Sequence, residues 1–401
     1  MLTLRGSRAP RRGSELNQLN IIPDGSILVR DGIVQEVGPT RRVENLGLAR
    51  QAIEVSAVGR VVMPGFVDSH THMLFPAPGA PSPGIEPGAR ALHGVTALRL
   101  RALARPYLES MARHGTTTAE VKTGSGADES AELKILRVAA ELKQEPISLL
   151  ATVLFRLRAG AGEDALPLEQ RWVCDEFLPK VWRRHLARFA DLAGEDESDI
   201  QGFAAQYFQS ARRLGLGCKV HADSANPSEA VRVGVAHGAV GIDHLEHVTE
   251  GDAALLGRAE SVATLLPAAS FHAQGRFAPG RALIDAGVAV ALATNFNPHH
   301  TPTFSMQTVV ALACRHMDLT PAEAISAATI NGAHALGHAA HVGSLELGKS
   351  ADLVVLNVSD YRDLARHFGA NLVHMTMKRG EVIYEQDVVA PRPVEDLRPA
   401  W

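Results

Sequence analysis

Three histidines of the sequence follow short apolar runs, at the places where buried strands would end. His70 and His72 lie two residues apart in "PGFVDSHTHMLF", and His221 follows "GCKV". Because alternate residues of a strand point to the same side, His70 and His72 can reach one ion together. Three neutral nitrogen donors with one position left open for water are the usual ligand set of catalytic zinc. The spacing therefore predicts a metal site with hydrolytic chemistry.

Several of these histidines also have a simpler interpretation. Two histidines near a strand end can be hydrogen-bonded barrel residues, and it is His221 that favours the metal site. His244, which ends "VGID", is either a further ligand or a hydrogen-bond donor to substrate. His334, His338 and His341 have helical spacings that could chelate a metal, but no carboxylate is paired with them and exposed helical histidines are common.

The segment "VALATNFNPHH", residues 290–300, begins as an apolar run and ends in polar groups. At its centre stands Asn295, an amide where a metal hydrolase would be expected to carry a carboxylate. An amide oxygen can contact a metal ion, but it cannot accept the proton that an attacking water must give up. The sequence thus leaves open whether this site is fully active.

The composition indicates a large globular protein that acts on a small molecule. The 401 residues are 46% hydrophobic, enough for a large α/β core and a smaller second domain. Forty Lys and Arg stand against 44 Asp and Glu, and the charges are scattered, so neither nucleic acid nor a membrane is an expected partner. No apolar run is long enough for a transmembrane helix, and no apolar signal segment follows the N-terminal arginines. The three separated cysteines suggest a reducing compartment, so we expect a cytoplasmic protein.

The two ends of the chain share a β pattern that the middle lacks. "SILVRDGIVQEVG" alternates apolar and polar residues around Asp31-Gly32, a dipeptide suited to a tight hairpin turn. "DLVVLNV" and "VHMTMKRGEVIYE" predict a buried strand and a second hairpin, which turns at Arg379-Gly380. We therefore expect residues 1–63 and 342–401 to form one composite β domain.

Residues 64–341 repeat a different unit, a short apolar run that ends in a polar residue and precedes a helical stretch. "LGCKVHAD", "AVGIDHLEH" and "VAVALATNFNP" are examples, and this rhythm is typical of parallel βα units. Residues 127–144 predict an amphipathic helix, and Thr320, Pro321 and Glu323 predict the start of another. In parallel barrels the functional groups lie at the C-terminal ends of the strands, where these polar residues fall.

Taken together, the segments resemble the amidohydrolase superfamily. The resemblance is carried by "MPGFVDSHTH", "HADS", "DHLEH", "ALATNFNP" with "TPTFSM", and "NGAHALG". "TTTAEVKTGSGADESAELKILR" and "HADSANPSEA" are most similar to the imidazolonepropionases, which open the ring of imidazolone-5-propanoate in histidine breakdown. The resemblance covers nearly the whole chain. It implies an α/β fold, a (β/α)8 TIM-like barrel with a small composite β-sandwich domain from both termini, and one Zn²⁺ or Fe³⁺ per chain.

The resemblance also implies roles for individual residues. His70, His72 and His221 match the three histidine ligands of the family, and Asn295 stands at its metal-binding aspartate. His244 matches a further active-site histidine, so the expected catalytic residues are His244 and Asn295. The expected substrate contacts are Glu120, Lys122, Ser125, Ser224, Asn297, His299 and His300.

The pocket departs from the family's pattern at several positions. A Pro- and Gly-rich segment, residues 76–88, replaces an arginine and a longer substrate-binding segment. A substrate-binding histidine expected near residues 154–158 is absent, and two arginines stand there. The other replaced residues are a tyrosine, now Ser125, a Glu or Gln, now Ser224, and a small pair that helps to bind the substrate's carboxylate, now His299-His300.

The function that follows is a metal-dependent hydrolase of a C–N bond in a cyclic amide or amidine. The expected reaction converts imidazolone-5-propanoate to N-formimidoyl-L-glutamate, or opens a related ring. The alternative is a catalytically impaired metal- or ligand-binding protein of the same fold, because Asn295 replaces the expected aspartate. A small cyclic substrate is the expected partner, and the sequence leaves a homodimer open.

Overall fold

Eight parallel strands form the largest sheet of the molecule. The computed structural model describes residues 1–6, 8–75, 92–124, 128–143, 145–156, 165–193, 200–222 and 227–386. The sheet has the order β11-β10-β9-β8-β7-β6-β5-β4, so strands that follow each other in the sequence are neighbours in space. These strands are β4 (Phe66–Asp68), β5 (Thr116–Lys122), β6 (Ser148–Arg156), β7 (Phe189–Ala193), β8 (Gly217–Ala222), β9 (Gly241–His244), β10 (Val262–Leu265) and β11 (Ala289–Leu292).

The sheet closes into a barrel just beyond the ends of its first and last strands. Thr71 and Phe296 form a parallel bridge. The His72 amide donates to the Phe296 carbonyl over 2.7 Å, and the Asn295 amide donates to the His70 carbonyl over 3.0 Å. The closure therefore places the residues after β4 beside those after β11. The predicted (β/α)8 barrel is confirmed.

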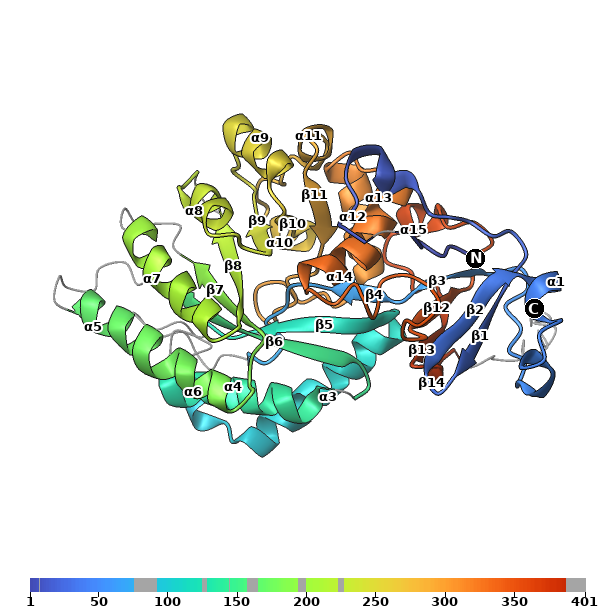
Figure 1. Cartoon of the computed structure of the whole chain (residues 1–401), viewed down its shortest axis with the longest axis horizontal. Helices are drawn as coiled ribbons and strands as arrows, with labels where there is room; N and C mark the ends of the chain where they lie inside the picture. The colour runs from blue at the N-terminus through green and yellow to red at the C-terminus, as the bar shows by residue number, and fades with distance from the viewer. Residues whose placement is uncertain are drawn as a thin grey trace, which may run out of the picture.

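Helices surround this barrel on its outer side (Figure 1). Two of the predicted helices are confirmed, and both begin at a capping side chain. The Asp128 side chain accepts from the Ala131 amide, and Thr320 and Glu323 form a capping box. The α-helices after β4 are α3 (Ala97–Arg113), α4 (Glu129–Leu142), α5 (Ala165–Trp172), α6 (Leu178–Arg183), α7 (Ile200–Arg213), α8 (Ala230–Ala236), α9 (Glu250–Arg258), α10 (Pro267–His272), α11 (Gly280–Asp285), α12 (Met306–His316), α13 (Pro321–Ser326), α14 (Gly332–Ala335) and α15 (Asp363–Arg366).

Strands from both parts of the chain build two smaller sheets at one side of the barrel (Figure 1). β3 (Val61–Pro64) comes from the N-terminal part, and it completes a four-stranded antiparallel sheet with β12 (Leu353–Leu356), β13 (Val373–Lys378) and β14 (Glu381–Glu385). β1 (Gly25–Arg30) and β2 (Ile33–Pro39) form a separate hairpin. The composite β region agrees with the expected fold class, while the domain boundaries at 63/64 and 341/342 stay predictions.

Both predicted hairpin turns are confirmed. Asp31 and Gly32 have φ values of 52° and 77°, and Arg379 and Gly380 have φ values of 51° and 75°. Two successive residues in this left-handed region are the signature of the tight turn whose twist matches antiparallel strands.

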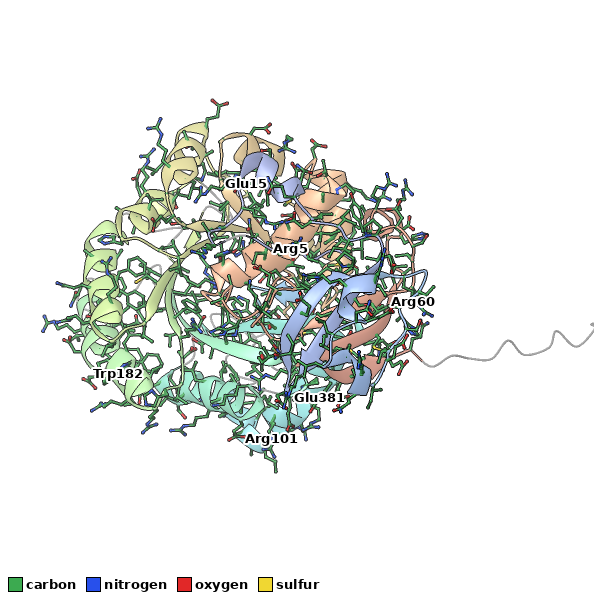
Figure 2. The ribbon with its side chains drawn as sticks, turned by 45° about the vertical axis from the view of Figure 1, so that its right-hand side comes forward. Arg5, Glu15, Arg60, Arg101, Trp182 and Glu381 are labelled. Carbon is green, nitrogen blue, oxygen red and sulfur yellow. The ribbon has the colours of Figure 1, made fainter. Side chains whose placement is uncertain are left out.

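Arg11 holds the N-terminal segment together, and Arg12 binds this segment to the barrel. The buried guanidinium of Arg11 donates to the carbonyl oxygens of Leu4 and Gln18, each over 2.6 Å. The Arg12 guanidinium donates to the carbonyl oxygens of Ala259 and Gly287 over 2.6 and 2.9 Å. Figure 2 shows this segment, with Glu15, against the barrel helices, while Arg101 and Trp182 lie at the periphery.

Among the helices in the described ranges, none has the length and apolar character that a membrane span requires.

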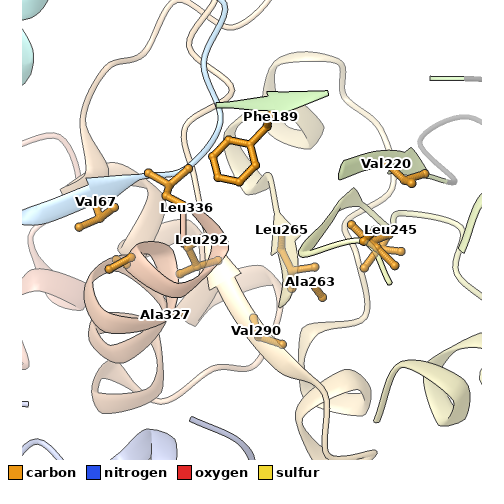
Figure 3. Close-up of a cluster of buried hydrophobic side chains, with 14 of the residues drawn as sticks. Val67, Phe189, Val220, Leu245, Ala263, Leu265, Val290, Leu292, Ala327 and Leu336 are labelled. Carbon is orange, nitrogen blue, oxygen red and sulfur yellow. The ribbon is translucent and has the colours of Figure 1, made fainter. Parts of the chain in front are cut away.

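The barrel strands divide their side chains between an apolar outer face and a polar inner face. Val220 belongs to the main apolar core, as does Leu245 (Figure 3). Lys219 and His221, on either side of Val220, point the opposite way, because side chains alternate along a strand. The strand period of two therefore directs polar residues toward the barrel axis.

Candidate functional site

The structure brings His70, His72 and His221 together at the C-terminal ends of β4 and β8. The ring centroids of His70 and His221 are 4.8 Å apart, and those of His70 and His72 are 5.2 Å apart. One nitrogen from each ring lies within 4.8 Å of the other two. All three side chains are buried. A single ion can therefore contact all three rings.

The three histidines are neutral near pH 7. Burial lowers the pKa of each imidazole well below its usual range. The positive charge of Lys122 adds to this lowering of the pKa at all three rings. Neutral imidazole is the form that donates a lone pair to a metal.

A carboxylate lies behind each of two of these rings. His70 Nδ1 donates to Asp243 Oδ2 over 2.8 Å, which leaves His70 Nε2 as a lone pair 3.3 Å from His72 Nε2. His221 Nδ1 lies 3.1 Å from Asp191 Oδ2. A carboxylate behind a histidine fixes the ring's tautomer and orientation and raises its basicity toward a metal.

Several buried polar atoms of the site lack a hydrogen-bond partner among the described residues, including His72 Nδ1, both ring nitrogens of His221 and Asn295 Oδ1. Asn295 is joined to the histidines through the hydrogen bond between its amide and the His70 carbonyl. Buried polar atoms without partners are rare in folded proteins, and such atoms point to a missing ion or water. A nitrogen-rich donor set with open atoms on His221 and Asn295 fits a metal ion.

Beneath the histidines lie five fully buried charged side chains. Lys122 Nζ is 2.5 Å from Asp191 Oδ2 and 2.7 Å from Asp243 Oδ2. Lys219 Nζ is 2.7 Å from Glu120 Oε2. Burial alone would lower the pKa of Lys122, but Asp191 and Asp243 outweigh it and raise that pKa. Three carboxylates and two ammonium groups give this charged cluster a net charge of −1, which favours a cation above it.

The sequence interpretation missed three members of this charged cluster, namely Asp191, Lys219 and Asp243. A signal was present, because each is a single charged residue inside an apolar strand, in "FADLA", "GCKVHA" and "GIDH". Lys219 also lies two positions before His221, on the same side of β8. Charges at alternating positions of a buried strand are explained by partners on other strands.

A buried aspartate holds the turn that carries Asn295. Asp68 Oδ1 accepts from the Thr294 amide over 3.0 Å, and Asp68 Oδ2 accepts from the Thr294 hydroxyl over 2.6 Å. Burial raises the pKa of Asp68 to about 7, although both Thr294 bonds oppose the change. Asn295 itself has a φ of 52°, an uncommon value outside glycine that is frequent at functional sites.

Glu120 and Lys122 were predicted to contact the substrate, but both side chains lie deeper in the barrel, below the histidines. Both side chains are 0% exposed. The Glu120 carboxylate accepts from Thr152 and Lys219, and the Lys122 ammonium is shared by two aspartates. Their polar atoms are therefore bound by protein groups below the histidines.

His244 lies at the end of β9, beside the metal-binding rings. Its ring centroid is 5.5 Å from that of His70 and 5.2 Å from that of His221. His244 is only half-buried, its φ is 86°, and its Nδ1 lies 3.4 Å from Glu246 Oε2. It thus combines closeness to the three histidines with access to solvent.

The remaining predicted contacts divide into two groups. Asn297 Oδ1 accepts from the amides of His299 and His300 over 2.9 and 3.4 Å, so Asn297 shapes the turn that presents these two side chains. His299 is half-buried and His300 is exposed. Ser125 and Ser224 lie outside the described residues.

The helical histidines do not take part in a metal-binding group. Within the described ranges, two groups of three have metal-ligand spacing, and they are His70, His72 and His221, and Asp191, His221 and Asp243. The ring centroids of His338 and His341 are 4.8 Å apart, but neither they nor His334 belongs to such a group.

A parallel barrel with histidines converging at the carboxyl ends of its strands is an architecture of metal-dependent hydrolases. Comparisons with known proteins support this class. The family model described as "Amidohydrolase family" matches residues 61–383. The imidazolonepropionase of Deinococcus radiodurans is 38% identical over 382 residues, which cover 91% of this chain and 93% of that protein. The imidazolonepropionase of Brevibacillus brevis is 34% identical over 416 residues, with 96% of each covered.

Solved structures support the same fold at lower identity. Guanine deaminase from E. coli has a TM-score of 0.74 at 18% identity, covering 96% of this chain and 97% of that one. An adenosine deaminase from Xanthomonas campestris, a structure with bound zinc, has a TM-score of 0.65 at 20% identity, covering 90% and 88%. The chain belongs to the amidohydrolase family and, within it, to the imidazolonepropionases, so it is a metal-dependent hydrolase of carbon–nitrogen bonds in cyclic amides. These comparisons favour the hydrolase over the catalytically impaired alternative.

The charged cluster generates a prediction about stability. Lys122→Met should lower the free energy of unfolding by about 3–5 kcal/mol, because Asp191 and Asp243 would then be buried without their shared cation. Chemical denaturation measures this change. The matched control is Lys180→Met, which removes a half-exposed ion pair with Glu129 and should cost about 1 kcal/mol or less. Equal losses in the two variants would contradict the role given to Lys122.

Proposed function

We propose that the chain is a zinc enzyme that opens an imidazolone ring or a closely related cyclic amide or amidine. The observation that carries the proposal is the convergence of three neutral, buried histidine nitrogens within 4.8 Å of one another at the barrel mouth. Relatives that are 34 and 38% identical over nearly the whole chain are imidazolonepropionases, which supports imidazolone-5-propanoate as the first substrate to test.

His70, His72 and His221 would hold the ion, and the amide oxygen of Asn295 would complete the set. When bound, the ion would supply Lewis acidity, polarising the ring carbonyl and acidifying a water molecule. Three imidazoles and an amide favour Zn²⁺ over Fe³⁺, because imidazole suits zinc, whereas a hard trivalent ion gains most from anionic oxygen ligands. We therefore expect one zinc per chain.

The chain's own residues hold the ligands in place. Asp243 and Asp191 orient His70 and His221, and Lys122 ties these two carboxylates together. Asp68 fixes the turn before Asn295. Lys122 thus acts on the site through the aspartates, which replaces the substrate contact expected from the sequence.

Proton handling is assigned to His244. Asn295 cannot accept the proton that water gives up on attack. His244 lies close to the three histidines and keeps access to solvent, and its Nδ1 lies 3.4 Å from Glu246 Oε2. His299, on the half-buried turn after β11, is the alternative base.

The substrate and the setting of the enzyme complete the proposal. We expect a small cyclic molecule as the partner, with no role for nucleic acid, in a cytoplasmic protein that is a candidate homodimer. The test is a hydrolysis screen of zinc-loaded protein over imidazolone-5-propanoate, hydantoins and dihydropyrimidines. Ring opening of the imidazolone would support the proposal, and turnover of no ring in this panel would contradict it.

The first prediction concerns metal binding. Purified protein should hold one zinc per chain, and His221→Ala should weaken zinc binding at least ~100-fold, because one of three strong donors is lost. Elemental analysis and chelator competition measure this. His272→Ala, an exposed histidine on α10, is the control and should leave zinc binding unchanged. Full zinc occupancy in His221→Ala would contradict the ligand set.

His244 should affect turnover and not the metal. We expect His244→Ala to keep its zinc and to lower kcat about 10²-fold or more, since a general acid or base contributes roughly 10² to 10⁴. Zinc content and steady-state rates are measured on the same preparation. The assignment is wrong if His244→Ala loses zinc as completely as His221→Ala does.

The third prediction is that Asn295→Asp speeds the reaction. The carboxylate adds both an anionic ligand and a proton acceptor, so kcat should rise roughly 10²-fold or more at equal zinc loading. Asn295→Ala is the control, because it removes the oxygen without adding a base and should not be faster than wild type. If the aspartate variant binds zinc but turns over no ring faster, proton transfer does not limit the wild-type rate.

A further inference from the structure

Strand β6 brings an arginine to the level of the metal-binding histidines. Arg156 is paired in register with Ala193 on β7, and Ala193 is paired in register with His221 on β8. Neighbouring strands are about 4.8 Å apart, so the backbone of Arg156 lies about 10 Å from that of His221. The two residues therefore occupy the same level of the barrel mouth.

The alternation of β6 directs the Arg156 side chain to the inner side of the barrel. Thr152 is known to point inward, because its hydroxyl donates to Glu120 Oε1 over 2.5 Å. Arg156 follows four positions later in the same strand, so its side chain lies on the same face of the sheet as that of Thr152. In the register of the sheet Ala193 lies between Arg156 and His221, and its side chain is a single methyl group.

Among the described residues, Arg156 also carries a cation at this mouth that is not paired with a protein group. The buried ammonium groups of Lys122 and Lys219 are both held by carboxylates. Arg156 is exposed, and within the described part of the chain no residue forms a hydrogen bond or an ion pair with its guanidinium.

We propose that Arg156 binds a carboxylate on the substrate and so makes this site prefer anionic rings over neutral ones. A planar guanidinium offers two parallel N–H groups that match a carboxylate, which a lysine cannot do. A ring held at the histidines would reach Arg156 through a short carboxylate-bearing arm, given the separation of about 10 Å between β8 and β6. This inference rests on the proposed function, and it names a residue that selects the substrate.

The test compares two unreactive ligands that differ in charge. Imidazole-4-propanoate and its neutral amide, imidazole-4-propanamide, are titrated calorimetrically into zinc-loaded wild type, Arg156→Gln and Arg156→Lys. Wild type should bind the acid at least ~10-fold more tightly than the amide, since a hydrogen-bonded charge pair contributes that much or more. Arg156→Gln should lose roughly 10- to 100-fold for the acid and stay within ~2-fold for the amide, while Arg156→Lys should keep part of the preference.

A matched control and a kinetic measurement make the test specific. Arg101→Gln removes an exposed arginine on the outer helix α3 and should leave the preference for the acid unchanged. In turnover of an anionic ring, Arg156→Gln should raise KM with little change in kcat, and turnover of an uncharged ring should not change. Thermal unfolding checks that all variants are folded.

The outcomes separate this inference from the hydrolase proposal. If Arg156→Gln keeps the wild-type preference for the acid, or if wild type has none, the role of Arg156 is overturned even when rings are hydrolysed. If the preference is present and disappears in Arg156→Gln, the role stands even when no ring of the panel is turned over, and only the proposed reaction fails.

Discussion

One ammonium group links the parts of this site. Lys122 reaches from β5 to Asp191 on β7 and Asp243 on β9, the two strands on either side of the one that carries His221. The same two carboxylates face Nδ1 of His221 and of His70, which belong to β8 and to the end of β4. A buried charge is tolerated only when paired, so this arrangement fixes the strands and the imidazoles to each other. These ion pairs fix the positions of the side chains more than they stabilise the fold, because an apolar core of similar volume would be about as stable.

The inner polar layer depends on the twofold period of the strands. On β5, Ala119 and Val121 pack against the helices, while Glu120 and Lys122 point to the axis. β8 divides in the same way around Val220. A shift of one residue in either strand would exchange the two faces and place charges in the apolar core. The apolar contacts outside the barrel therefore set the depth at which each charge lies inside it.

This dependence explains what could be predicted from the sequence. The ends of apolar runs are visible, and parallel strands share an edge, so the barrel and the meeting of His70, His72 and His221 followed from the sequence and its family resemblance. The partners of Asp191 and Asp243 could not be inferred, because pairing across strands depends on register, which a single sequence does not contain. Lys122 was identified as functional but placed too near the pocket, since the sequence does not show how deep the last residue of a strand lies.

A carboxylate at the position of Asn295, after β11, would both attract the metal ion and accept a proton from water. In this chain these two tasks fall to different groups. Asn295 brings no charge to the ion. The charged cluster below the histidines has a net charge of −1, and it attracts a cation whether or not residue 295 is charged. The cluster cannot also take up a proton from water. Asp243 and Asp191 are fully buried, and each has an oxygen held by Lys122 and facing a histidine. We therefore assign a proton released at the mouth to a group with access to solvent, and among the described residues His244 is a half-buried side chain beside the rings of His70 and His221.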